Sequence, residues 1–185
     1  MIWRKYDLSY LKIPNIYSWY FSKGDHLLVL GGYNGTVPIS NVESITFDSI
    51  DDECDPADLV EALNHHSTVA SSRGVVTCGG WDRNDPTAKC SIQSEGVSSP
   101  FPSMVNKRFL FGMVNVNGII YSIGGKGSET TMETIELNHG TKWKEEEMPF
   151  GIGSPCVVNL GAKIYVIGGY SGDDIGGEVC KIIFL

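Results

Sequence analysis

The chain has 185 residues, 42% of them apolar, which is enough for one domain with a sizeable hydrophobic core. No stretch approaches the roughly 20 consecutive apolar residues of a membrane-spanning helix, which excludes such a span. Because 22 acidic residues outweigh 14 basic ones and no basic cluster relieves the net charge of −8, the composition also argues against nucleic-acid binding.

A strand pattern opens the chain at residues 3–6, and a repeat follows it. Short Val, Ile, Tyr and Phe runs between turn residues, with 22 glycines, predict an all-β fold. A Gly-Gly doublet ends an apolar run four times, beginning at Gly31, Gly79, Gly124 and Gly168. The spacings of 48, 45 and 44 residues are typical of four-stranded propeller blades.

Each repeat predicts the same series of strands. A first strand and a tight turn precede the apolar run, which predicts a buried second strand, and an alternating run after the doublet predicts a half-buried third strand. A fourth strand is clearest at residues 143–149. The predicted second strands are 27–30, 75–78, 120–123 and 164–167, and the predicted third strands are 42–47, 89–92, 132–137 and 179–184.

These strands divide the chain into four blades and one extra strand that belongs to a preceding or closing blade. The extra strand lies in 1–15, and the blades span 16–63, 64–106, 107–149 and 150–185. The extra strand could complete the last blade and close a four-bladed ring, or the chain could be part of a larger propeller. We prefer the partial propeller, whose open blade edges predict self-association.

Blade 3 carries the motifs that identify the repeat. It has an apolar strand with Tyr121, a Gly-Gly doublet, a strand of alternating residues, and Trp143 before a Met-Pro turn, and in this it resembles the kelch-repeat family. The resemblance covers all four blades, although Leu28 and Val76 replace the tyrosine in the first two. It implies a kelch-type β-propeller, similar to that of galactose oxidase, with four four-stranded antiparallel blades, whole or partial.

Five cysteines include no C-x-x-C pair, so the spacing of a zinc ribbon is absent. Cys78 ends the second strand of blade 2 and Cys90 opens the third, which brings the two within reach of a disulfide. Two buried free thiols are the alternative. Asn34 begins an Asn-Gly-Thr glycosylation sequon. Together these features favour an extracellular parent protein over a cytoplasmic one, although no signal peptide is evident.

The sequence predicts no catalytic residue, metal site or cofactor. Its four histidines are scattered and are interpreted as turn or surface residues, and the acidic run 48–58 lacks the glycine and the final glutamate of a calcium loop. Copper-radical oxidases also carry kelch-like blades, but their copper ligands and Tyr-Cys cross-link find no match here. Such an enzyme is therefore the remote alternative.

The segments that follow the doublets carry the candidate binding residues. Because strands alternate in direction, these segments emerge at one end of every blade, where a rigid scaffold can present them to a partner. Aromatic residues and Arg are typical of binding hot spots, so Tyr33, Trp81, Arg83 and Tyr170 are predicted to line a protein- or peptide-binding face. The alternatives are that the rings pack as lids on their own blades, and that the chain is a structural fragment without a binding face.

Overall fold

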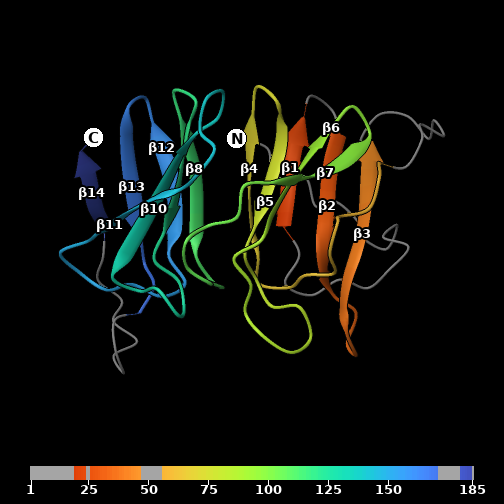
Figure 1. Cartoon of the computed structure of the whole chain (residues 1–185), viewed down its shortest axis with the longest axis horizontal. Coiled ribbons are helices and arrows are strands. Elements are labelled where there is room, and N and C mark those ends of the chain that lie inside the picture. Colours follow the sequence, from red (N-terminus) through yellow and green to blue (C-terminus); the bar gives the residue numbers. More distant parts are fainter. Residues whose placement is uncertain (1–18, 24–25, 47–55, 171–179, 185) are drawn as a thin grey trace, which may run out of the picture.

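The structure is a computed structural model of the chain, and it describes residues 19–23, 26–46, 56–170 and 180–184 (Figure 1). Within these ranges the regular structure is all β, in fourteen strands that form four antiparallel sheets. None of the described residues forms a helix that could cross a membrane. The all-β fold of antiparallel blades predicted from the repeat is confirmed.

Each sheet is one blade, and its strands lie side by side in chain order. Blade 1 contains β1 (Trp19–Lys23), β2 (His26–Tyr33) and β3 (Pro38–Thr46). Blade 2 contains β4 (Ser67–Ser71), β5 (Gly74–Cys78), β6 (Cys90–Ser94) and β7 (Val97–Phe101). Blade 3 contains β8 (Gly112–Val116), β9 (Ile119–Ile123), β10 (Thr131–Glu136) and β11 (Lys144–Glu147). Blade 4 contains β12 (Cys156–Leu160), β13 (Lys163–Ile167) and β14 (Cys180–Phe184).

The blades stand in a row, and neighbouring blades meet through their first strands. β1 contacts β4, β4 contacts β8, and β8 contacts β12. In Figure 1, blade 1 lies at one end of the row and blade 4 at the other. The segment 1–15, predicted to supply a closing strand, lies outside the described residues, so ring closure stays a prediction.

Alternating side chains of the second strands fill the spaces between blades. In β5, Val75 packs toward blade 1 while Val76 and Cys78 pack toward blade 3. The joint between blades 3 and 4 repeats this arrangement, with Tyr121 and Ile123 packed in one cluster with buried residues of β13. An apolar cluster thus lies in each internal joint, and burial of such clusters is the main stabilising contribution to an array of this kind.

The Gly-Gly doublets sit where two blades approach most closely. The first glycines of the first three doublets have positive φ, and a Cβ there would lie 2.3–3.0 Å from a backbone carbonyl in the segment that leads into the first strand of the next blade. The N–H of the second glycine donates to that same carbonyl. The bonds are Gly32 to Leu63 (2.8 Å), Gly80 to Arg108 (2.9 Å) and Gly125 to Ile152 (2.9 Å). The doublet is therefore a joint between blades, as the absence of a Cβ suggests.

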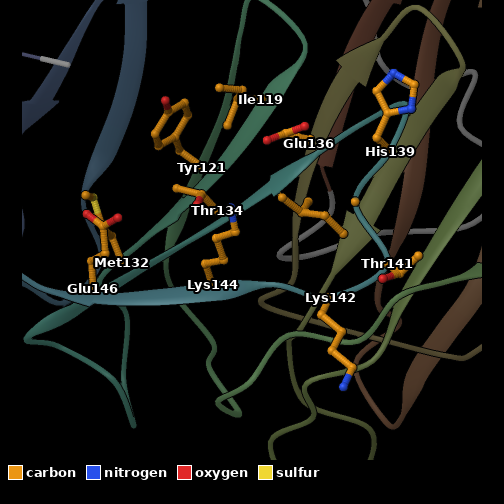
Figure 2. Close-up of a pocket in the computed structure, with 12 residues that line it drawn as sticks. Ile119, Tyr121, Met132, Thr134, Glu136, His139, Thr141, Lys142, Lys144 and Glu146 are labelled. Atoms are coloured by element: carbon orange, nitrogen blue, oxygen red, sulfur yellow. The ribbon is translucent and has the colours of Figure 1, made fainter.

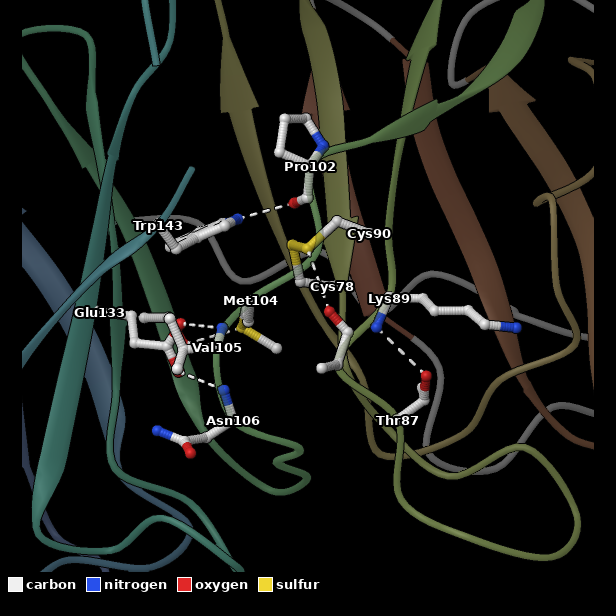
Figure 3. The surroundings of a disulfide bond; sticks show 12 residues. Cys78, Thr87, Lys89, Cys90, Pro102, Met104, Val105, Asn106, Glu133 and Trp143 are labelled. Atoms are coloured by element: carbon white, nitrogen blue, oxygen red, sulfur yellow. Dashed lines mark hydrogen bonds between the residues drawn. A yellow bond between two sulfur atoms is a disulfide. The ribbon is translucent and has the colours of Figure 1, made fainter. Parts of the chain in front are cut away.

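A fully buried ion pair holds blade 3 together. Arg108 Nη2 lies 2.6 Å from Glu133 Oε1, and neither side chain is exposed. The guanidinium also donates to the carbonyl of Gly124 (2.9 Å), while the carboxylate accepts from the N–H groups of Val105 (2.6 Å) and Asn106 (3.0 Å) (Figure 3). Burial lowers the pKa of Arg108, and the charge of Glu133 opposes that shift. The pair ties the segment before β8 to β10 and to the doublet.

A disulfide joins Cys78 to Cys90, as one of the two sequence alternatives predicted. The two residues face each other across β5 and β6, with Cα atoms 4.1 Å apart. Both are buried in the layer between blades 2 and 3, where Figure 3 shows the bond near Met104 and Trp143. The Trp143 indole N–H closes the same joint by donating to the carbonyl of Pro102 (2.7 Å).

Candidate binding face

The first residue after the Gly-Gly doublet occupies an equivalent place in the last three blades. In blades 2 to 4 it forms a pair of backbone hydrogen bonds with a residue just before the first strand. These pairs are Asn64 with Trp81 (3.1 and 2.8 Å), Phe109 with Lys126 (3.3 and 2.8 Å) and Gly153 with Tyr170 (2.8 and 2.9 Å). The segments after the doublets gather at the lower end of the view in Figure 1. We call this end, with Tyr33, Trp81, Arg83, Lys126 and Tyr170, the loop face.

Trp81 and Tyr170 lie at two ends of one row of side chains. The Trp81 ring contacts Phe109 edge to face, with centroids 5.1 Å apart and planes at 81°. Phe109 is bonded through its backbone to Lys126, whose ammonium lies 5.5 Å from the centroid of the Tyr170 ring. All three aromatic rings are partly exposed. The row therefore presents aromatic edges and one cation over blades 2 to 4.

Arg83 stands at the tip of a tight turn in the same blade as Trp81. The Asp82 carboxylate accepts from the N–H groups of Asn84 (3.1 Å) and Asp85 (3.2 Å), and this fixes the turn. Those two bonds also lower the pKa of Asp82, so its carboxylate stays charged well into the acidic range. Arg83 has a φ of 91° and is exposed. Arg83 therefore presents its positive charge to solvent from a turn that two hydrogen bonds fix.

The aromatic residues also serve the packing of their own blades. A Cβ at Gly153 would lie 2.3 Å from Cζ of Tyr170, so the tyrosine ring lies directly on this glycine. Tyr33 pairs with Pro38 across the end of blade 1 and is partly exposed there. The row described above does not include it. The structure thus places Trp81 and Tyr170 in one row, linked through Phe109 and Lys126, and this row includes neither Tyr33 nor Arg83.

Two residues of this row were not among the sequence candidates. Lys126 holds the same position after its doublet as Trp81 and Tyr170, so the repeat alone already places it at the start of its loop. Lysine is not typical of binding hot spots, so its residue type did not mark it as a candidate. Phe109 precedes β8, far from its doublet, and no local pattern in the sequence places its ring beside Trp81.

The glycosylation sequon that begins at Asn34 lies in an exposed turn. Its side-chain oxygen accepts from the N–H groups of Thr36 (3.0 Å) and Val37 (2.9 Å), while the residue itself is exposed. Glycosylation at Asn34 stays a prediction.

A groove on the side of blade 3 is a separate feature (Figure 2). It has a volume of about 440 Å³ and is lined by residues of β9, β10 and β11 and of the turn between the last two. Lys144 and Glu146 bring opposite charges to it, and burial raises the pKa of Tyr121. Nowhere in the described ranges do three His, Cys, Asp or Glu side chains form a group that could hold a metal ion.

One histidine interpretation was wrong. His66 was expected at a turn or on the surface, but it is 1% exposed and lies between blades 1 and 2, near Gly31 and Gly80. Burial lowers its pKa to about 4. The segment that leads into β4 and carries His66 therefore turns inward, because the glycines of two doublets leave room for the imidazole ring.

Replacing His66 by Gln is expected to remove part of the acid sensitivity of the fold. Between about pH 6.5 and 4, His66 is protonated in the unfolded chain but stays neutral in the folded chain. The free energy of unfolding therefore falls as the pH falls through this window. Between pH 7.5 and 4.5, the free energy of unfolding of the wild-type chain should decrease by about 2–3 kcal/mol more than that of His66→Gln. Urea unfolding at both pH values measures this. His139→Gln, at an exposed site, is the control, and an unchanged pH dependence in His66→Gln would contradict the assignment.

The four sheets lie side by side and contact each other through their first strands, and one set of loops lies at one end. This arrangement is that of a β-propeller array. No family model matches the chain. Kelch-like protein 40a of Danio rerio is 27% identical over 71% of this chain and 24% of its own length. Kelch-like protein 41 of Rattus norvegicus is 25% identical over 73% of this chain and 25% of its own. The chain thus spans about a quarter of the length of the curated relatives it matches.

A solved structure shares the fold. The structure of YjhT, a kelch-type β-propeller, has a TM-score of 0.73 and 12% identity to this chain, over 85% of this chain and 59% of that one. The repeat, the blade topology and the kelch-like relatives agree, and together they support the kelch-repeat family for this chain.

Proposed function

We propose that this chain is a non-enzymatic kelch module that binds a protein or peptide partner through the loop face. The observation that carries the proposal is the row from Trp81 through Phe109 and Lys126 to Tyr170, which the paired backbone bonds hold at one end of three blades. Partly exposed aromatic rings beside fixed cations are typical of binding hot spots. A rigid base limits the entropy that such a surface loses on binding.

The chemistry of the loop face favours a partner with carboxylates. Arg83 and Lys126 are both exposed on it, and Asp82 is engaged by its own turn. A cation close to an aromatic ring suits a carboxylate that stands beside an apolar side chain. We therefore expect an acidic segment with at least one large apolar residue to bind here. The expected partner is a protein, and no cofactor takes part.

Arg83→Ala is expected to weaken partner binding without changing the melting temperature, because Arg83 is exposed at the tip of its turn. Peptides selected on the wild-type chain from a displayed library should bind the variant at least tenfold more weakly, as measured by fluorescence anisotropy. Lys142→Ala removes an exposed cation near the groove of blade 3 and should leave affinity unchanged. Trp81→Ala should lower both affinity and melting temperature, because its ring packs on Phe109.

The results separate binding from a purely structural role. If no peptide is selected, or if selected peptides bind Arg83→Ala and Lys126→Ala as well as the wild type, the loop face is not a binding site. The chain would then be the structural fragment that the sequence left as an alternative. Self-association is a separate proposal, which concerns a different surface.

A further inference from the structure

The dipeptide Asn-Gly occurs in two turns of the described chain, and both asparagines are exposed. Asn34-Gly35 lies between β2 and β3 in blade 1, and Asn117-Gly118 lies between β8 and β9 in blade 3. An asparagine followed by glycine can lose its side-chain amide without an enzyme. The next backbone nitrogen attacks the side-chain carbon, and glycine brings no Cβ to obstruct that attack. The two pairs have the same local sequence, so any difference between their reactivities comes from the fold.

The turn at Asn34 holds the side-chain oxygen as an oxyanion would be held. Oδ1 of Asn34 accepts from the backbone N–H groups of Thr36 (3.0 Å) and Val37 (2.9 Å). When a nitrogen adds to Cγ of Asn34, negative charge develops on this same oxygen. Two donors that are already in place stabilise the developing charge more strongly than the neutral amide, as in the oxyanion holes of acyl-transfer sites. The turn therefore favours addition at Cγ.

The nitrogen that would attack is accessible. Asn34 donates its backbone N–H to the carbonyl of Val37 (3.2 Å), but within the described residues the N–H of Gly35 donates no hydrogen bond. A Cβ on Gly35 would meet nothing within 4 Å, so the space around this residue is open. Asn34, Gly35 and Thr36 are all exposed, so water reaches the reacting groups.

The second pair has the opposite arrangement. The N–H of Gly118 donates to Oδ1 of Asn115 (3.0 Å), and the carbonyl of Gly118 accepts from the N–H of Leu137 (2.8 Å). Asn117 lies at the tip of the tight β8–β9 hairpin, with a φ of 52°. The Gly118 nitrogen must lose its bond to Asn115 before it can attack, and the hairpin bonds oppose the movement. The fold therefore protects Asn117.

We propose that Asn34 is a site of spontaneous deamidation, which the fold promotes there and suppresses at Asn117. The Gly35 nitrogen bonds to Cγ of Asn34, the bond from Cγ to Nδ2 breaks, and ammonia leaves with the proton of the Gly35 N–H. Water then opens the five-membered succinimide ring at either of its carbonyl groups, which yields aspartate or isoaspartate. Water is the only co-reactant.

The reaction competes with the glycan predicted at Asn34, because both processes use Nδ2. A sugar on Nδ2 keeps that nitrogen in place, whereas deamidation removes it and destroys the sequon. The product also adds a carboxylate to a chain of net charge −8, directly after Tyr33 of the loop face. The reaction needs no partner, so it is independent of the proposed binding function.

Peptide mapping by mass spectrometry measures both sites in one sample of the 185-residue chain, prepared without glycosylation and incubated at pH 7.4 and 37 °C. In the folded chain, Asn34 should deamidate at least tenfold faster than Asn117. In the chain unfolded in urea at the same pH, the two rates should agree within about threefold, because both turns are then lost. Asn34 should react no faster in urea than in the folded chain.

Asn115→Ala tests the protection of the second pair, because it leaves the N–H of Gly118 without its acceptor. The rate at Asn117 should rise at least fivefold in this variant. Asn159→Ala is the matched control, since Asn159 holds the register of Asn115 in blade 4, and it should leave the rate at Asn117 unchanged. An Asn115→Ala chain that is folded and deamidates at Asn117 as slowly as the wild type overturns the role of this bond.

Gly35→Asp tests the attacking nitrogen at the first site. Gly35 has a φ of +94°, and Asp tolerates positive φ better than most residues. Its side chain obstructs the backbone nitrogen, so the rate at Asn34 should fall at least tenfold. Equal rates at Asn34 and Asn117 in the folded wild-type chain overturn the proposal. An Asn34 that deamidates more slowly in the folded chain than in urea overturns it as well, because the turn would then protect this residue.

Discussion

Glu133→Gln should lower the free energy of unfolding by about 3–5 kcal/mol, the usual effect of removing one partner of a buried ion pair. Arg108 would stay fully buried with a neutral amide in place of its counter-charge. The same substitution weakens the bonds that the carboxylate accepts from Val105 and Asn106, so the segment before β8 loosens. Urea unfolding followed by tryptophan fluorescence measures the change.

Glu136→Gln is the matched control for this prediction, because it removes an exposed carboxylate from the same strand and should change stability by less than about 0.5 kcal/mol. If Glu133→Gln gives no soluble protein, the double variant Arg108→Met with Glu133→Gln still tests the argument. It removes the stranded charge and should be more stable than Glu133→Gln alone. Equal stability of Glu133→Gln and wild type would show that the ion pair does not hold blade 3.

Cys78→Ala combined with Cys90→Ala should lower the free energy of unfolding by about 3 kcal/mol, as expected for a disulfide that closes a short loop. The two sulfur atoms join residues 12 apart in sequence and also fill part of the layer between blades 2 and 3, so the substitution leaves a small cavity as well. Thermal unfolding of the variant and of the wild type measures the loss.

Cys156→Ala serves as the control, because Cys156 is exposed and unbonded and its removal should leave stability almost unchanged. Alkylation of the unreduced chain provides the direct chemical check. Cys78 and Cys90 should stay unlabelled until the chain is unfolded and reduced, whereas Cys156 should react at once. Labelling of Cys78 and Cys90 in the unreduced chain would contradict the disulfide.

Strand order and register could be predicted from the sequence because they follow from local patterns. The apolar runs before the doublets, the turns and the alternation after the doublets are each set within a few residues, and the structure places β5, β9 and β13 at the predicted second strands. The pairing of Cys78 with Cys90 was accessible for the same reason, since both flank one hairpin. Even so, the sequence left free thiols as an alternative.

Contacts between blades were beyond the reach of these patterns. Glu133 lies 25 residues from Arg108, and nothing near either residue marks the pair. Phe109 meets Trp81, and His66 turns inward, only because two blades pack against each other there. The candidate site shows the same division, since the position of Tyr170 after its doublet was predictable but its contact with Lys126 was not.

The position of the disulfide has a consequence for its chemistry. Cys78 is 0% exposed and Cys90 is 7% exposed, and blade 3 covers both. Thiol–disulfide exchange requires an attacking thiolate to reach one of the two sulfur atoms. A thiol reductant can therefore act on this bond only when blades 2 and 3 separate. Reduction of the bond in the folded protein is therefore limited by how often blades 2 and 3 separate, and not only by the concentration of reductant around it.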